Sequence, residues 1–142
     1  EGFRAAIAQH PSFQIVAEEE CSGQLEIAMP VMAEMLAVHP DIDVVMALND
    51  PAALGAIAAL RSAGRAPTDT MVYGVDGVPE SRDLIRARWM TATAVQSPRS
   101  IGRMAAEQAY RILAGEGAAD VTLPTRLLTV ENVDENDGGG WD

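Results

Sequence analysis

Short apolar runs alternate along this chain with longer segments of helical periodicity, and this alternation constrains the fold more than any other feature. The runs have the length and the β-branched content of strands, and they fall at residues 13–17, 44–48, 71–75 and 90–95, followed by two short extended pieces at 121–123 and 126–130. Several of them lack the polar alternation of a strand that faces water. We therefore expect an α/β fold, a doubly wound and mostly parallel sheet with helices on both faces.

Helical segments fill the intervals between these runs. We expect a short helix that ends near His10, and longer helices at 23–38, 51–63, 79–86 and 98–114. Ser22 is the expected N-cap of the helix at 23–38, and Pro30 inside it predicts a kink or a late start. The apolar face predicted for this helix consists of Ile27, Val31, Met35 and Val38.

The size and charge of the chain limit its class. At 142 residues it is long enough for one compact domain with a core of its own. A formal net charge of -11 repels phosphate backbones and anionic membrane surfaces, so we expect no nucleic-acid partner. The single cysteine, Cys21, cannot form an intramolecular disulfide. The first ten residues have helical spacing with no cap before them, which predicts a piece of a longer protein.

Polar side chains follow three of the predicted strands. Asn49 and Asp50 come after the run at 44–48, Asp76 follows the next run, and Gln96 follows the run after that. In α/β sheets ligands bind outside the carboxyl ends of the strands, so these residues are candidate ligand contacts. An amide both donates and accepts, and a carboxylate accepts from two adjacent hydroxyls, so the set suits a polyhydroxylated neutral molecule. No strand end carries a catalytic pair, and we expect no enzyme.

Each of these residues also has a structural interpretation. Asp50 is the expected N-cap of the helix that Pro51 opens, which leaves Asn49 without that duty. Asn49 fits an Asx-turn equally well, and Asp76 fits a turn at the exit of its strand. Gln96 also fits a simple polar link to the next helix. The residues by themselves leave these alternatives open.

Nothing in the sequence predicts a cofactor or a metal. The stretch from Gly74 to Gly77 lacks the spacing of a dinucleotide fingerprint, and no GxxxxGK[ST] loop is present to hold a phosphate. The acidic run at 18–20, followed by Cys21, places consecutive side chains on opposite faces of an extended segment. A solvated acidic edge is therefore the expectation there, and not a metal site.

Three longer stretches carry a family resemblance, namely PDIDVVMALNDPAALGAIAAL, MVYGVDGVPES and TATAVQSPRSIGRMAAEQAYRIL. Their succession of Asn-Asp, Gly-x-Asp-Gly and Gln-x-Pro at strand ends resembles the C-terminal half of the periplasmic sugar-binding proteins of ABC transporters. This is the ribose-binding-protein-like group, with the type I periplasmic binding protein fold and a flavodoxin-like lobe. The resemblance runs from residue 1 to about residue 130. It implies that Asn49, Asp76 and Gln96 contact a sugar, with Asp76 taking paired hydroxyls.

The resemblance also implies a function. It indicates a solute-binding component that captures a neutral sugar or polyol between two lobes and presents it to the membrane permease of an ABC transporter, without a cofactor. The implied location is periplasmic or extracytoplasmic, as a lipoprotein if the source is Gram-positive. Many members carry an aromatic residue near the position of Gly23 and another where this chain has Val75, so the identity of the sugar does not follow.

A division of the chain is implied as well. Residues 1–96 would form the C-terminal lobe, 97–120 a helix that belongs to the other lobe, 121–131 returning strands, and 132–142 an acidic, glycine-rich tail. Because the first half of the other lobe is absent from this sequence, we expect the chain alone to bind sugar weakly or not at all. We also expect the helix at 98–114 either to fold back onto its own sheet or to exchange with a second copy.

Two alternatives use the same lobes and hinge. One is the effector-binding domain of a LacI-type transcriptional regulator, and the other is a chemoreceptor binding protein that senses a sugar or a signal. Regulators more often have a Gly-Tyr-Asp-Asp-like run where this chain has Gly74-Val75-Asp76-Gly77. That difference favours transport.

Overall fold

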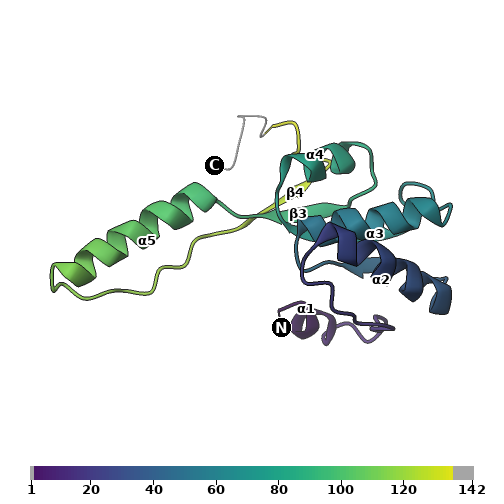
Figure 1. Ribbon diagram of the computed structural model, residues 1–142, viewed down its shortest axis with the longest axis horizontal. Helices are drawn as coiled ribbons and strands as arrows, with labels where there is room; N and C mark the ends of the chain where they lie inside the picture. Colours follow the sequence, from purple (N-terminus) through teal and green to yellow (C-terminus); the bar gives the residue numbers. More distant parts are fainter. Residues whose placement is uncertain (1, 136–142) are drawn as a thin grey trace.

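A four-stranded mixed sheet organises the chain (Figure 1). The computed structural model describes residues 2–135. The strands are β1 (Val44–Met46), β2 (Met71–Asp76), β3 (Ala92–Val95) and β4 (Arg126–Thr129), in the spatial order β1-β2-β3-β4. β1, β2 and β3 run parallel, and β4 pairs antiparallel with β3. The predicted α/β fold with a mostly parallel sheet is confirmed, and the carboxyl ends of three strands meet at one edge.

The helices lie close to their predicted positions. They are α1 (Gly2–Ile7), α2 (Leu25–Val38), α3 (Asp50–Ser62), α4 (Pro79–Arg86) and α5 (Pro98–Leu113). A proline in the first turn begins α3, α4 and α5, where its missing N–H costs no helical hydrogen bond. α2 starts ahead of Pro30 and has Gln24 at its N-cap, so the predicted cap at Ser22 and the predicted late start are wrong.

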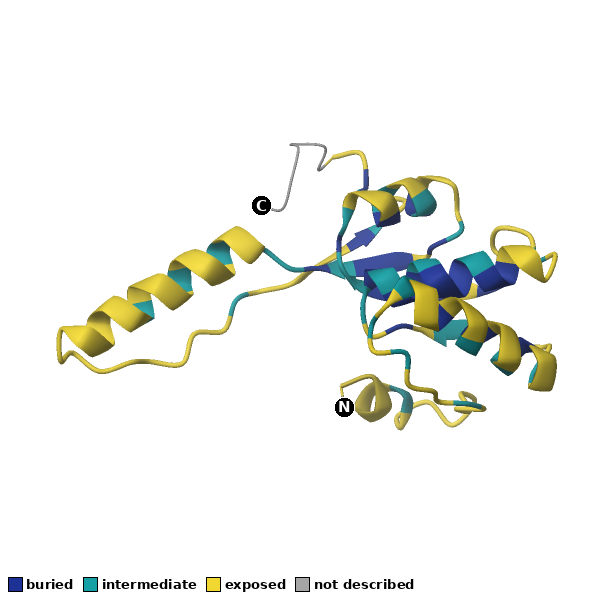
Figure 2. Ribbon diagram, viewed as in Figure 1, coloured by how far each residue is buried: buried dark blue, intermediate teal, exposed yellow. Residues whose placement is uncertain are grey.

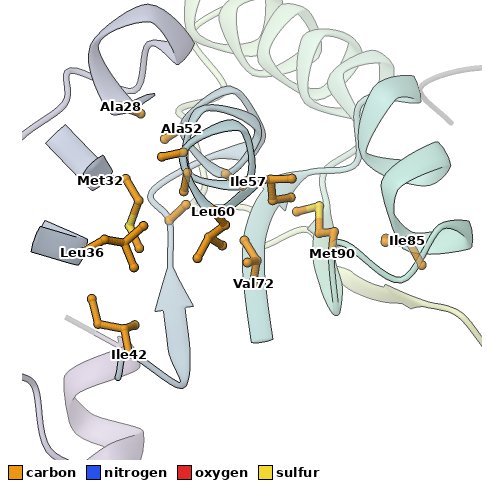
Figure 3. Packing of buried hydrophobic residues seen from close by; sticks show 14 of the residues in the cluster. Ala28, Met32, Leu36, Ile42, Ala52, Ile57, Leu60, Val72, Ile85 and Met90 are labelled. Atoms are coloured by element: carbon orange, nitrogen blue, oxygen red, sulfur yellow. The ribbon is translucent and has the colours of Figure 1, made fainter. Parts of the chain in front are cut away.

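The core between α2, α3 and the sheet combines several alanines with larger apolar side chains such as Leu36, Leu60 and Met90 (Figure 3). α3 presents a largely alanine surface to it, in which Ile57 and Leu60 are the large members. Gly55 marks the crossing with α2, because a Cβ at this position would lie 2.6 Å from the carbonyl oxygen of Leu25 and 2.8 Å from the Cβ of Ala28. The two helices therefore approach closely only because α3 carries glycine and alanine there.

The buried face of α2 differs from the predicted one. The buried residues are Ala28, Met32 and Leu36, whereas Ile27 is 38% exposed and Val38 is 72% exposed. α2 is apolar nearly all round, so its periodicity does not select one face. The close contact at Gly55 selects it instead, because only a small residue such as Ala28 fits against the glycine.

The predicted strands at 13–17 and 121–123 are not strands in the structure. In the first, Phe13, Ile15 and Val16 are about half exposed. An apolar hollow of about 530 Å³ is lined by this segment on one side and by β1 and α2 on the other. The segment has the composition of a strand, but a strand also needs a neighbouring strand whose backbone can form hydrogen bonds with it. The hollow lies between residues 13–17 and β1, so the segment does not pair with that strand.

α5 projects away from the layers formed by the sheet and the other helices (Figures 1 and 2). None of its residues is buried, and Leu113 is 87% exposed. The returning chain, at 114–125, runs alongside α5 before it enters β4. Gln108 touches this return, since its Oε1 accepts the N–H of Ala119 at 3.0 Å. The helix therefore does not fold back onto its own sheet, which was one of the two expected arrangements.

The packed chain continues past β4. Residues 130–135 form turns, and Val133 is buried in the core. Asp134 Oδ1 accepts the Arg86 Nε–H at 2.9 Å, which ties this turn to α4. The predicted tail at 132–142 thus begins within packed structure, and 136–142 lie outside the described residues. Within 2–135, no helix has the length and apolar character needed to cross a bilayer.

Candidate ligand-binding site

The side chains of Asp76 and Gln96 meet at the edge where the parallel strands β2 and β3 end. Asp76 is the last residue of β2, opposite Val95, and Gln96 follows directly after β3. Gln96 Nε2 donates to Asp76 Oδ1 at 2.9 Å, and the Gln96 backbone N–H donates to the Asp76 carbonyl at 3.2 Å. Both residues are half-buried. Two of the three predicted ligand contacts are therefore joined directly, which fixes the orientation of the carboxylate.

Asn49 follows β1 at the same edge, and both ends of its amide have protein partners. Its Oδ1 accepts the N–H of Ala52 at 3.0 Å, which makes Asn49 the N-cap of α3. Its Nδ2 donates to the carbonyl oxygen of Gly23 at 3.0 Å. The prediction that Asp50 is the cap, and that Asn49 is free of this duty, is wrong. An amide keeps one further donor and one further acceptor, so Asn49 remains a candidate contact.

Asp50 has a different task, which sequence reasoning missed. It is fully buried, and its Oδ2 accepts the backbone N–H groups of Gly77 at 2.8 Å and Val78 at 2.9 Å. Its Oδ1 accepts the hydroxyl of Thr93 at 2.6 Å. A carboxylate without water is stable only with such partners. Asp50 therefore ties the start of α3 to the turn after β2 and to β3.

A sequence signal for this contact does exist. Gly74 lies in the middle of β2, where a glycine weakens a strand and marks a close approach by another group. A Cβ on Gly74 would lie 2.3 Å from Asp50 Oδ1 and 2.6 Å from the Cε of Met90. Gly74 thus leaves the space that the buried carboxylate fills. The glycine in mid-strand indicates that another group lies close to the backbone, and the structure identifies that group as the Asp50 carboxylate.

The pKa of the Asp76 carboxyl group is raised above its ordinary value. Burial is the largest cause, because the carboxylate loses hydration at the sheet edge, and the negative charge of Asp50 acts in the same direction. Hydrogen bonds from the Gln96 side chain and the Asp50 backbone oppose this rise by stabilising the ionised form. The site therefore holds a carboxylate whose hydrogen-bonding capacity is only partly used by the protein.

The site lies on an open edge and not in the apolar hollow beside β1. That hollow is lined by Val75 and Leu48 among others, and by none of Asn49, Asp76 and Gln96. Within residues 2–135, no group of three or more His, Cys, Asp or Glu side chains is arranged to hold a metal ion. The edge offers donors and acceptors to one side of a polar ligand.

Comparison with known proteins places this geometry in context. Residues 1–117 match the model of the periplasmic binding protein domain. The chain is similar to the ribose import binding protein RbsB of Salmonella typhimurium, with 39% identity over 116 residues that cover 82% of this chain and 38% of that protein. It is also similar to the D-apiose import binding protein of Paraburkholderia graminis, with 36% identity over 112 residues, 79% of this chain and 35% of that protein.

Solved structures agree with these relatives. The Caulobacter myo-inositol binding protein bound to myo-inositol superposes with a TM-score of 0.87 and 34% identity, over 96% of this chain and 47% of that one. A Mycobacterium smegmatis protein in complex with β-D-fucofuranose superposes with a TM-score of 0.89 and 26% identity, over 97% and 46% of the two chains. The chain spans less than half the length of the relatives it matches.

Proposed function

The chain belongs to the periplasmic binding protein family, and on that premise we propose that the protein containing it is the solute-binding component of an ABC transporter. It captures a neutral sugar or polyol outside the cytoplasmic membrane and presents it to the membrane permease. It performs no chemical step of its own. In a Gram-positive source it is anchored as a lipoprotein.

The pairing of Asp76 with Gln96 is the observation that carries this proposal. A carboxylate that is held by an amide at 2.9 Å and still has unused acceptor capacity is suited to two neighbouring hydroxyl groups. Asn49 adds an amide on the neighbouring strand end. Such a set favours a neutral, hydroxyl-rich ligand, which agrees with the ribose and D-apiose in the names of the relatives.

The same proposal divides the chain between two lobes. Residues 1–96 form most of one lobe, and the chain after Gln96 crosses toward the other, so that α5 packs there. Support comes from the exposure of α5, whose apolar side chains find no core in the described part of the chain. The ligand is then enclosed between the open edge at Asp76 and a surface of the second lobe, and the isolated chain binds it weakly.

Calorimetry of the full-length protein tests the function. We expect at least one member of a panel of ribose, apiose, allose and myo-inositol to bind with a Kd of about 1 μM or lower, and leucine to give no heat. Asp76→Asn should weaken that binding by about tenfold or more. Asp69→Asn is the matched control, because Asp69 is an exposed aspartate that also accepts a backbone N–H. This change should leave sugar binding unaltered.

Two results would contradict the proposal. The first is an absence of binding for every sugar and polyol in the panel, and the second is an Asp76→Asn protein that binds like the wild type. Specific binding of operator DNA by the full-length protein would instead support the LacI-type alternative.

A further inference from the structure

Asp50 accepts three hydrogen bonds at the sheet edge, although the sequence predicts it to be a helix N-cap. Its two oxygens accept three hydrogen bonds, from the N–H groups of Gly77 and Val78 and from the Thr93 hydroxyl. It is fully buried, so neither water nor a ligand reaches it. Its contacts join α3, the turn after β2, and β3.

The residue just before the bonded turn is Asp76, and its backbone is strained. Its φ is 125°, in a region that residues with a Cβ rarely adopt. Such a conformation persists only when the surrounding structure holds it. The next two backbone N–H groups, of Gly77 and Val78, are the ones that Asp50 holds at 2.8 and 2.9 Å. The hydrogen bonds from Gly77 and Val78 to Asp50 therefore hold the backbone directly after Asp76 and help to maintain its positive φ.

Asp50 is connected to the candidate ligand contacts through the turn at Gly77 and Val78, which directly follows Asp76. The strained backbone at Asp76 directs its carboxylate to Gln96 Nε2, at 2.9 Å. A different φ at Asp76 would change the direction of its Cα–Cβ bond and with it the position of the carboxylate. Gly74 belongs to the same arrangement, since any side chain there would displace the Asp50 carboxylate.

We propose that Asp50 is a positioning residue for ligand recognition: by bonding the Gly77–Val78 turn it holds the Asp76 carboxylate in the orientation that pairs with Gln96 and receives the ligand. The inference rests on the proposed function for the ligand, a hydroxyl-rich neutral molecule, but its mechanism concerns only the residues of this chain. Asp50 does not touch the ligand.

Two pairs of variants of the full-length protein test this role. Asp50→Ala removes all three acceptor contacts, whereas Asp50→Asn keeps the shape, with its oxygen toward the turn and its NH₂ toward the Thr93 hydroxyl. Val78→Pro deletes one turn donor at a residue whose φ of −61° suits proline, and Val78→Ala keeps that donor. Circular dichroism first establishes that each variant is folded at the temperature of the binding assay.

The expected result is a split within each pair. Asp50→Ala and Val78→Pro should weaken the binding of whichever panel sugar the wild type prefers by about tenfold or more. Asp50→Asn and Val78→Ala should stay within about threefold of the wild type. A folded Asp50→Ala protein with wild-type affinity would overturn the proposal, and where that variant does not fold, wild-type affinity in Val78→Pro would overturn it.

A measurement without sugar separates this proposal from the proposed function. Carbon-detected NMR titration of Asp76 in the sugar-free protein should give a lower pKa in Asp50→Asn than in the wild type, because the neighbouring negative charge is gone. The amide resonances of Gly77 and Val78 should shift in the same variant. If the Asp76 pKa and the amide resonances of Gly77 and Val78 were all unchanged in Asp50→Asn, the positioning role would be overturned. A wild-type protein that binds no panel sugar would overturn only the proposed function.

Discussion

Asn49 spans two parts of the fold, because its amide accepts the N–H of Ala52 in α3 and donates to the carbonyl oxygen of Gly23 ahead of α2. Gly23 has a φ of 64°, and a Cβ there would lie 2.8 Å from Asn49 Nδ2. The carbonyl of Gly23 is thus within reach only because that residue has no side chain. Asn49 is therefore both a helix cap and a connection between the two helices that enclose the core.

Asn49→Ala should lower stability as well as ligand affinity. Losing an N-cap costs about 1 kcal/mol in the free energy of unfolding, and the bond to Gly23 is lost with it. Asn49→Asp is the matched variant, because a carboxylate also caps a helix but has no donor for the Gly23 carbonyl. Urea denaturation of the three proteins should rank the wild type first, then Asn49→Asp, then Asn49→Ala. A fully stable Asn49→Ala protein would contradict the cap.

Asp50→Ala should cost more stability than Asn49→Ala. It strands two backbone N–H groups and a buried Thr93 hydroxyl, and the loss should be about 3 kcal/mol. Chemical denaturation followed by circular dichroism measures both variants under the same conditions. If Asp50→Ala proved the milder change, the buried network around Asp50 would not stabilise the fold as described.

Gly74→Ala tests the space beside Asp50. The added methyl would lie 2.3 Å from Asp50 Oδ1 and 2.6 Å from the Cε of Met90, and we expect a loss of about 3 kcal/mol in the free energy of unfolding. Gly102→Ala is the control, because Gly102 lies in α5 with nothing within 4 Å of an added Cβ. That change should be neutral or stabilising by up to about 1 kcal/mol. Equal effects at the two glycines would contradict the close approach.

The raised pKa of Asp76 predicts a pH dependence of stability. A carboxyl group with a raised folded-state pKa binds its proton more tightly in the folded than in the unfolded state. Its contribution to the free energy of unfolding therefore decreases as the pH rises from about 4 through the folded-state pKa, and the reduction remains at pH 7. Asp76→Asn removes this titration.

Denaturation at two pH values measures the effect. The stability of Asp76→Asn relative to the wild type should be higher at about pH 7 than at about pH 3. Asp69→Asn serves as the control, because this exposed aspartate precedes the first residue of β2, whereas Asp76 is the last residue of that strand. An Asp76→Asn protein whose relative stability is the same at both pH values would contradict the raised pKa.

Amide hydrogen exchange tests where α5 packs. In the 142-residue chain α5 has no buried residue, so its amides should exchange far faster than those of α3. In the full-length protein, α5 should gain protection comparable to that of α3, since it would lie in the second lobe. Equal protection of α5 in the two proteins would contradict this division.

Light scattering of the 142-residue chain tests whether two copies exchange α5.

The candidate site was predictable to the extent that it follows from strand ends. Asp76 and Gln96 were predictable as polar residues at strand ends of a mostly parallel sheet, whereas the pairing of β2 with β3, which brings their side chains within 2.9 Å, is a finding of the structure. The roles of Asn49 and Asp50 did not follow, because either side chain caps a helix equally well. Only the position of the Gly77–Val78 turn, from a different part of the chain, decides which of them is buried.

Local periodicity and chain order were enough to predict the alternation of strands and helices, the mostly parallel direction of the strands and the edge of the sheet at which polar residues gather. Long-range packing, by contrast, selects the buried face of α2, leaves residues 13–17 without strand structure and brings Asp50 to the turn beside Asp76. The physical reason is the same in each case. An apolar segment or a carboxylate has several local solutions, and the partners that choose among them are brought in from distant parts of the chain.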